Sequence, residues 1–192
     1  MKYSIILIDP AWKQNKTVRK CRPNQNRQFD YTTMDIETIT KIIQKASLIG
    51  ETNHNLFLWT IDKYLFEAEK IAKDLNYKLH ARIIWNKTNG VAPGFTVRYG
   101  HEYLLWFYKE KLIPNAKEQR GKWLDVLTEK STKHSQKPEI SYTFIESLYP
   151  NVNKIELFGR IDRKNWDIIK GKDNADGTGQ DIIKEIEERY EN

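Results

Sequence analysis

The stretch Tyr3-Ser4-Ile5-Ile6-Leu7-Ile8-Asp9-Pro10-Ala11-Trp12 decides how this chain is expected to fold. Its apolar run, broken only at Ser4, is typical of a buried strand that ends before Asp9. Ligands of open α/β sheets bind at the carboxyl ends of the strands, so this strand would place a carboxylate, a proline and an aromatic ring at that edge. Two alternatives follow: a plain turn, which Asp-Pro often opens, or a site for a flat heterocycle that carries an amine.

The chemistry of residues 9–12 suits such a heterocycle. The Asp9 carboxylate and the backbone carbonyl of Pro10 can both accept hydrogen bonds from an NH2 group. The Trp12 ring can stack on the heterocycle, as aromatic side chains do on bases that leave a nucleic-acid stack. These four residues do not decide between the alternatives by themselves.

Length and composition predict a single folded domain. The 192 residues are enough for a core, and 12% aromatic residues argue against disorder. No stretch is long and apolar enough for a membrane span, and no signal-peptide pattern is present. Cys21 is the only cysteine, which excludes an internal disulfide and favours a reducing, cytoplasmic setting. The histidines lack the spacing of metal ligands, so we expect no metal.

Positive charge is concentrated in the segment that follows the Asp9 motif. The net charge is +6, and between residues 9 and 30 the basic side chains occur without acidic ones. The segment predicts a long basic loop, which is either solvated or bound to the backbone of a nucleic acid. The substrate contacts that we predict within it are Lys16, Arg19, Lys20 and Arg22.

Apolar periodicity predicts strands that alternate with helices. Strands are expected at residues 3–8, 55–60, 77–85, 102–108, 123–127, 154–158 and 166–169, and helices at 35–49, 62–75, 138–149 and 181–190. Gly50 is expected to end the first helix. The alternation favours an α/β fold, with a mostly parallel sheet covered by helices on both faces.

Two further motifs suggest a bound ligand. In residues 133–138, Ser135 and Lys137 stand at the start of a helix, where they can bind a carboxylate or phosphate or can be a plain cap with a solvated lysine. Glu156 lies inside an apolar strand and needs a partner there. Arg160 is one candidate partner, and the hydroxyl or ammonium groups of a ligand are another.

Six blocks stand in one order along the chain: Asp9-Pro10-Ala11-Trp12, Tyr31-Thr32-Thr33-Met34, Leu56-Phe57-Leu58-Trp59, Ile84-Trp85-Asn86-Lys87-Thr88-Asn89, His134-Ser135-Gln136-Lys137-Pro138 and Glu156-Leu157-Phe158-Gly159-Arg160. Together they resemble the adenine-N6 methyltransferase family that includes the catalytic subunit of the eukaryotic messenger-RNA adenosine methyltransferase and small bacterial and phage proteins. The resemblance covers residue 3 to about residue 170. It implies a Rossmann-like, S-adenosylmethionine-dependent methyltransferase sheet in permuted order, with the catalytic motif first.

On the substrate side, the resemblance implies that Asp9 and Pro10 hold the target amine and that Trp12 contacts the base. Tyr31 would lie on a loop that closes over the site, and Glu102 is assigned to substrate binding.

On the cofactor side, the resemblance implies that Lys137 pairs with the carboxylate of the methionine part of S-adenosylmethionine. Glu156, Phe158 and Arg160 would line the adenosine part. The remaining cofactor contacts assigned in this way are Ile8, Asp9, Ser135, Leu157 and Lys172.

Two positions depart from the family pattern. Ala11 replaces a second proline, so we expect a less rigid loop and retained activity. Lys172 stands where family members often carry an asparagine that helps to hold the cofactor ribose, which weakens that assignment.

The expected function is methyl transfer from S-adenosylmethionine to the N6 amine of adenine in nucleic acid, with DNA favoured over RNA. The alternatives are an RNA adenosine methyltransferase and a catalytically silent, nucleic-acid-binding partner subunit. Residues 1–172 would form the methyltransferase domain, and residues 173–192 a linker and an amphipathic helix. The sequence leaves open whether that helix packs on the core or is an interface, and whether the chain forms a homodimer or a heterodimer with a related subunit.

Overall fold

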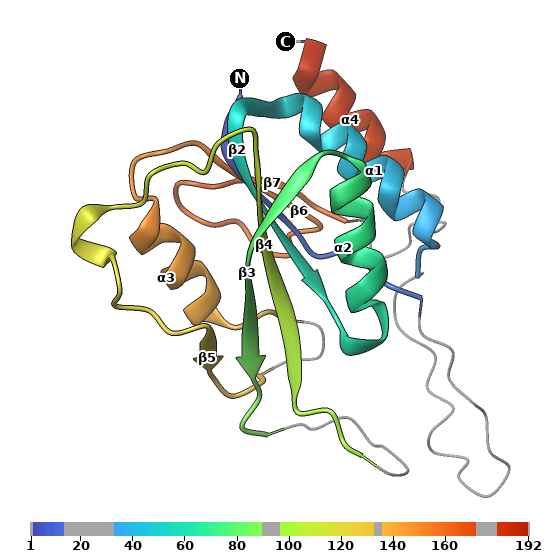
Figure 1. The fold of residues 1–192 in the computed structure, drawn as a ribbon. Coiled ribbons are helices and arrows are strands. Elements are labelled where there is room, and N and C mark those ends of the chain that lie inside the picture. The colour runs from blue at the N-terminus through green and yellow to red at the C-terminus, as the bar shows by residue number, and fades with distance from the viewer. Residues whose placement is uncertain (1, 14–32, 90–96, 133–135, 172–179, 192) are drawn as a thin grey trace, which may run out of the picture.

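A computed structural model describes residues 2–13, 33–89, 97–132, 136–171 and 180–191. Its centre is a seven-stranded sheet with the strand order β5-β3-β4-β2-β1-β6-β7 (Figure 1). The strands are β1 (Tyr3–Ile8), β2 (Gly50–Thr60), β3 (Tyr77–Asn86), β4 (His101–Lys109), β5 (Val126–Thr128), β6 (Lys154–Leu157) and β7 (Asp167–Ile169).

The sheet is mostly parallel, as predicted. β1 runs parallel to both of its neighbours, β2 and β6. Among the described strands β4 alone runs against the others, because it pairs antiparallel with both β2 and β3. The carboxyl ends of the parallel strands therefore share one edge with the amino end of β4.

Helices cover both faces of the sheet, which confirms the predicted α/β architecture (Figure 1). The helices α1 (Ile36–Ile49), α2 (Leu65–Asp74) and α4 (Gln180–Glu191) lie on one face, and α3 (Glu139–Leu148) lies on the other. Short 3-10 turns occur at η2 (Asp62–Tyr64) and η3 (Lys117–Gln119).

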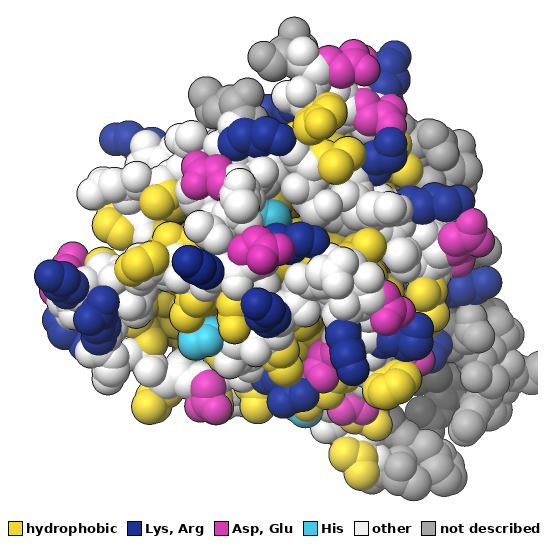
Figure 2. All heavy atoms as spheres, turned by 45° about the horizontal axis from the view of Figure 1, so that its top comes forward, with side chains coloured by type: hydrophobic (Ala, Val, Ile, Leu, Met, Phe, Trp, Pro, Cys, Tyr) yellow, Lys and Arg dark blue, Asp and Glu magenta, His cyan; other side chains and the backbone are white. Residues whose placement is uncertain are grey.

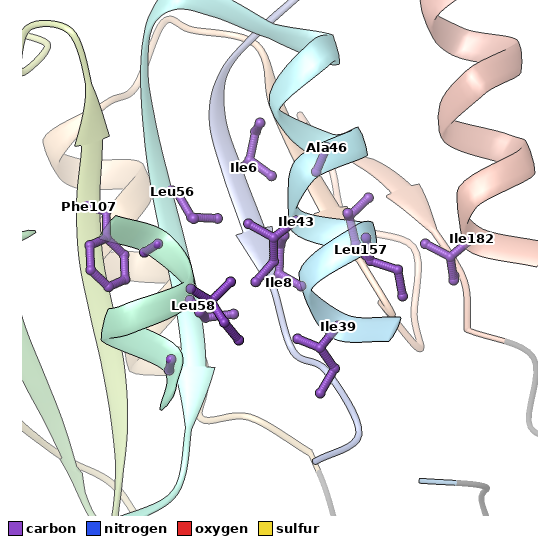
Figure 3. Close-up of a cluster of buried hydrophobic side chains, with 14 of the residues drawn as sticks. Ile6, Ile8, Ile39, Ile43, Ala46, Leu56, Leu58, Phe107, Leu157 and Ile182 are labelled. Carbon is purple, nitrogen blue, oxygen red and sulfur yellow. The ribbon is translucent and has the colours of Figure 1, made fainter. Parts of the chain in front are cut away.

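The strand β1 is buried on both sides, which explains why its side chains are nearly all apolar. Ile6 and Ile8 belong to the cluster under α1, and Figure 3 shows them beside Ile43. Ile5 and Leu7 belong to the cluster under α3. The strand that carries the Asp9 motif is thus fixed in the centre of the core.

Gly50 directly follows α1, as predicted, but it also begins β2 and lacks the left-handed backbone that glycine often has at a helix end. Its φ is −75°, which any residue adopts. The reason for a glycine is packing, because a Cβ atom there would lie 2.6 Å from Nδ1 of the buried His54 ring. The strand β2 thus begins at Gly50, five residues before the expected residue 55.

The strand β5 is shorter than the predicted strand at 123–127. Trp123 precedes it and packs on α3, with its ring centroid 5.4 Å from that of Phe144. Its indole N–H donates to Ser147 Oγ at 2.9 Å. Contact with a helix, rather than strand pairing, therefore accounts for the apolar character of this position.

The C-terminal helix α4 packs on the core of its own chain, which is one of the two alternatives left open above. Ile182 and Ile186 are buried in the cluster that contains α1, and Figure 3 shows Ile182 next to α1 and near Leu157. An ion pair of 2.6 Å joins Lys45 of α1 to Glu187 of α4. Of the helices in the described ranges, none has the length and apolar character needed to cross a membrane.

Candidate active site

Asp9 lies at the carboxyl end of β1, at the edge that the sequence predicted. Its backbone N–H points to the carbonyl oxygen of Leu157, with 3.5 Å between N and O, so the backbone is tied to β6. Its side chain is 22% exposed, and Oδ1 lies 2.9 Å from the ammonium nitrogen of Lys137. The central carboxylate of the motif is therefore held by a cation from the segment before α3.

Four charged side chains of alternating sign meet at this edge and form what we call the Asp9 cluster: Asp9, Lys137, Glu102 and Lys87. Lys137 Nζ bridges Asp9 and Glu102, with 3.1 Å to Glu102 Oε2, and Lys87 binds the other oxygen of Glu102. Lys87 follows β3 and Glu102 is the second residue of β4, so the antiparallel course of β4 brings them together. Alternating charge allows all four groups to be largely buried, because each ion has an opposite partner.

The same arrangement sets the ionisation of these groups. Burial alone would raise the pKa of Glu102, but Lys137 and Lys87 lower it to about 2. Burial alone would lower the pKa of Lys137, but the carboxylates of Asp9 and Glu102 raise it. Burial raises the pKa of Asp9, against the opposing effect of Lys137. Lys137 therefore stays charged and Glu102 stays ionised at neutral pH.

Two tryptophan rings lie beneath the cations. Lys137 Nζ is 5.3 Å from the centroid of Trp59, and Lys87 Nζ is 4.6 Å from that of Trp85. Each ring face attracts a cation. The indole N–H of Trp59 is enclosed, and within the described residues it has no hydrogen-bond acceptor. It is a free donor near the Lys137 ammonium.

Trp12 anchors the chain just after Asp9. It is 6% exposed, its ring stacks on Tyr64 at 5.2 Å, and its indole N–H donates to the Trp59 carbonyl at 2.8 Å. The backbone N–H of Trp12 donates to Pro10 O at 2.9 Å, so one lone pair of that carbonyl is already used. One ring face is covered, and the base contact expected of Trp12 stays a prediction.

The two ends of the basic segment lie side by side. Trp12 and Met34 form an isolated bridge, and Met34 N–H donates to Ala11 O at 2.8 Å. The segment between them thus starts and ends beside Asp9. Outside the described residues lie Lys16, Arg19, Lys20, Arg22, Tyr31, Ser135 and Lys172, and the roles expected of them stay predictions.

Glu156 is buried on β6, next to β1, and is 6% exposed. Its Oε1 accepts a hydrogen bond of 2.8 Å from the Tyr142 hydroxyl on α3. Burial raises the pKa of Glu156 to about 7. Tyr142, on the helix that covers this strand, is therefore a partner of Glu156 that the sequence does not reveal.

The turn after β6 is compact. Phe158 has a left-handed backbone, with φ at 69°, and a Cβ atom on Gly171 would lie 3.1 Å from its ring. Ile8 and Leu157, two of the expected cofactor contacts, are paired across β1 and β6 and are fully buried. The cofactor contacts expected of these two residues stay predictions.

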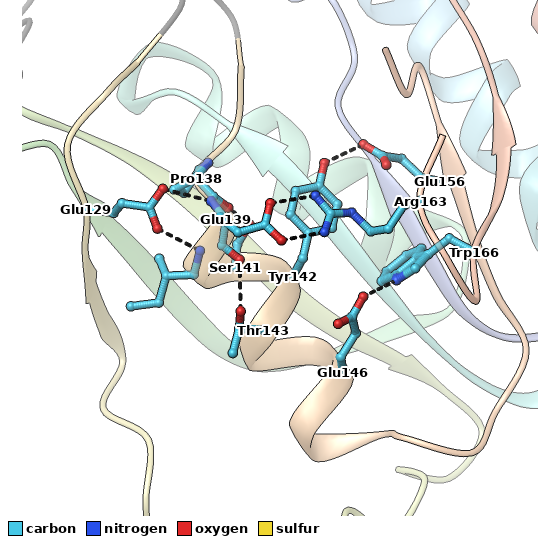
Figure 4. Close-up of polar contacts among 11 residues, drawn as sticks. Glu129, Pro138, Glu139, Ser141, Tyr142, Thr143, Glu146, Glu156, Arg163 and Trp166 are labelled. Atoms are coloured by element: carbon cyan, nitrogen blue, oxygen red, sulfur yellow. Dashed lines mark hydrogen bonds and ion pairs between the residues drawn. The ribbon is translucent and has the colours of Figure 1, made fainter. Parts of the chain in front are cut away.

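The first backbone N–H groups of α3 have an acceptor within the chain. The backbone N–H groups of Glu139 and Ile140 donate to the carboxylate of Glu129, at 2.8 and 2.7 Å (Figure 4). The chain thus supplies its own anion at this positive helix end. Lys137, which precedes the helix, binds Asp9 and Glu102 instead.

The segment that carries Lys137 is fixed to the end of β3. The Trp85 indole N–H donates to Glu129 O at 2.9 Å. The Asn89 amide makes hydrogen bonds with both backbone groups of Ser131, at 3.0 and 2.7 Å. Trp85 and Asn89, both in the block of residues 84–89, therefore position the approach to α3.

Sequence reasoning missed Lys87, Glu129 and Tyr142. Lys87 could have been found, because it follows a predicted strand whose carboxyl end lies at the site edge. The contacts of Glu129 and Tyr142 depend on how α3 is seated on the sheet. No local pattern signals them.

The opposite edge of the sheet carries a shallow hollow, which is lined in part by Leu48, Gly50 and His54. It lies at the amino end of β2, far along that strand from Trp59. Figure 2 views the molecule with this end turned forward, and Lys and Arg side chains there are interspersed with Asp and Glu. The coloured residues on this side form no continuous basic surface.

Comparison with known proteins matches residues 3–172 to the family MT-A70. The human N(6)-adenosine-methyltransferase catalytic subunit METTL3 is 24% identical over 199 residues, which cover 98% of this chain and 31% of that protein. The type II methyltransferase M.MunI of Mycoplasma sp is 25% identical over 182 residues, which cover 86% of this chain and 76% of that protein. The N(6)-adenosine-methyltransferase MT-A70-like protein of Drosophila melanogaster is 24% identical, with 30% of its length matched. The chain thus spans about a third of the length of these two animal relatives. Since the family match runs through the whole sheet and includes every residue of the Asp9 cluster, the chain belongs to the MT-A70 family.

Proposed function

We propose that this chain transfers a methyl group from S-adenosylmethionine to the N6 amine of adenine in a nucleic acid. The observation that carries the proposal is the Asp9 carboxylate, which stands at the carboxyl edge of the sheet with Lys137 bound to one of its oxygens. The matched relatives are named as methyltransferases, two of them for the N6 position of adenosine.

The donors and acceptors around Asp9 suit the proposed cofactor. S-adenosylmethionine carries a carboxylate, an ammonium group and a ribose diol. Lys137 has three ammonium protons and uses two of them on Asp9 and Glu102, which leaves one for a ligand carboxylate. Glu156 offers a buried acceptor for hydroxyl groups. When bound, the sulfonium supplies an electrophilic methyl group.

The residues of the chain would act by orientation. The nitrogen of an adenine amine is a poor nucleophile, because its lone pair is delocalised into the ring. The Asp9 carboxylate and the remaining lone pair of the Pro10 carbonyl would accept its two N–H groups and turn that lone pair out of the ring plane. Lys137 holds Asp9 in place for this, so the acceptors are arranged before the substrate arrives.

We propose DNA as the nucleic acid. Support comes from the match to the type II methyltransferase M.MunI, which covers 76% of that protein, against 31% of human METTL3. The target base must leave its stack to reach the Asp9 edge. The basic segment after Trp12, which begins and ends beside Asp9, is the proposed contact to the phosphate backbone.

A transfer assay with labelled S-adenosylmethionine and pools of DNA and RNA tests this function. We expect N6-methyladenine in the DNA, and a loss of about 10²-fold or more in Asp9→Asn. Asp74→Asn, a change in an exposed carboxylate that pairs with Lys70, is the matched control and should leave the rate unchanged. Transfer to RNA alone would refute the proposed substrate. No transfer to either pool, together with no cofactor binding in calorimetry, would favour the silent partner subunit.

A further inference from the structure

The Glu156 carboxylate is held from one side. Tyr142 donates to Oε1, and among the described residues this is the hydrogen bond that the carboxylate accepts. The other oxygen, Oε2, lies next to Gly159, where an added Cβ atom would be 3.3 Å away. Glycine at position 159 therefore places no side chain of its own against the second oxygen.

Tyr142 itself has little freedom. The Arg163 guanidinium lies 3.6 Å from the centre of the Tyr142 ring, and the Trp166 ring meets its edge at 5.9 Å. Arg163 is clamped in turn by both oxygens of Glu139, with 2.7 Å from Nη2 to Oε2. Figure 4 shows this series from Glu139 through Arg163 and Tyr142 to Glu156.

We infer that Tyr142 is a positioning residue, held by Arg163, which fixes Glu156 so that Oε2 accepts the ribose hydroxyls of S-adenosylmethionine. The inference rests on the proposed function and adds residues that the six sequence blocks did not single out. The Tyr142 hydroxyl donates to Oε1 while the Arg163 guanidinium covers a face of its ring.

The hydrogen bond also bears on when Glu156 is ionised. The groups that face its carboxylate are Tyr142, Asp9, Arg163 and Lys137. Burial raises the pKa of Glu156 to about 7 and Asp9 adds to this, while Tyr142 and the two cations oppose it. Removing the phenol therefore raises this pKa further. An ionised carboxylate is the better hydrogen-bond acceptor. The variant would therefore reach its full affinity for the ligand only at a higher pH.

Calorimetric titration of the full chain with S-adenosylhomocysteine from pH 6 to pH 9 tests the inference. Tyr142→Phe keeps the ring under Arg163 and removes the hydroxyl. We expect its affinity to fall about tenfold at pH 7, the loss to shrink toward pH 9, and the midpoint of the pH dependence to move up. Tyr149→Phe is the control, because Tyr149 is buried on the same face but its hydroxyl donates to Ile113 O, away from Glu156.

A Tyr142→Phe profile that coincides with that of Tyr149→Phe would overturn the inference and leave the proposed function standing. If the unmodified chain binds neither S-adenosylhomocysteine nor S-adenosylmethionine, the proposed function fails and the inference fails with it. Glu139→Ala supplies a second test, since Glu139 is exposed and its loss removes the carboxylate that holds Arg163. We expect a smaller loss of affinity in the same direction, and an unchanged pH midpoint would contradict the role of Arg163.

Discussion

Replacing Glu156 by glutamine should make the protein more stable at alkaline pH while it weakens the site. Glu156 is 6% exposed, and burial raises its pKa to about 7, against an ordinary value of 4.5. Glutamine has the same shape and its oxygen can still accept from Tyr142. The variant therefore removes the cost of a buried charge without removing the hydrogen bond.

The size of the effect follows from the difference in pKa. Below pH 4.5 the carboxyl group is protonated in both the folded and the unfolded chain, so Glu156 adds no cost. Above pH 7 it is ionised in both. The folded state is then destabilised by the full pKa difference of about 2.5 units between 7 and 4.5. At about 1.36 kcal/mol per unit this is roughly 3.4 kcal/mol. At pH 5 the same relation leaves under about 1 kcal/mol.

Urea denaturation of both proteins at pH 5 and pH 8.5 measures this. We expect Glu156→Gln to gain about 3 kcal/mol at pH 8.5 and little at pH 5. In thermal melts at pH 8.5 the gain corresponds to a rise of about 6–12 °C for a chain of this size. The matched control is Glu118→Gln, because Glu118 is exposed, and it should change neither value.

Two results would refute the reasoning. One is a gain that is the same at pH 5 and pH 8.5, which would mean that the ionisation of Glu156 is not its source. The other is a less stable variant at pH 8.5, which would mean that the carboxylate is stabilised in the fold. The cofactor affinity of the variant, measured beside its stability, should fall.

Three further predictions concern the charges around the site. Lys137→Met leaves Asp9 and Glu102 without their shared cation and should cost about 3–5 kcal/mol at pH 7. The folded pKa of Glu102 is about 2, below its ordinary 4.5, so its contribution to stability is present above pH 4.5 and disappears as the pH falls toward 2. Urea denaturation of Lys137→Met should therefore show a smaller loss of stability at pH 3 than at pH 7. Equal losses would contradict the ion-pair explanation. Glu129→Ala removes the acceptor for two N–H groups of α3 and should cost about 1–2 kcal/mol in the same melts, whereas a loss no larger than that of Glu118→Ala would exclude Glu129 as the helix cap. Neutral substitution of the basic segment should weaken binding to duplex DNA and flatten its salt dependence by up to about 0.9 for each phosphate that is no longer neutralised, measured by fluorescence anisotropy over several salt concentrations; an unchanged slope would favour a merely solvated segment. The residues to change are Lys16, Arg19, Lys20 and Arg22.

Local sequence patterns predicted most of the strands and helices and the edge at which the site lies, but not the start of β2 or the bounds of β5. Apolar runs and helical spacing depend on neighbours a few residues away, so β1, α1 and α4 could be predicted from them. Asp9 was placed correctly because it directly follows a strand, and strand ends define the edge of the sheet. The resemblance of the six blocks predicted the family that the comparison then found.

Only the tertiary structure decided which charges meet. The pairing of Trp85 with Glu102 sets the register of β3 and β4, and that register brings Glu102 within reach of both Lys87 and Lys137. The sequence placed Lys137 next to the start of a helix. In the structure, however, it is Glu129 that accepts hydrogen bonds from the backbone N–H groups at the start of α3. The physical reason is range: periodicity is a local property, whereas an ion pair between distant segments depends on strand order, strand direction and the position of a helix on the sheet.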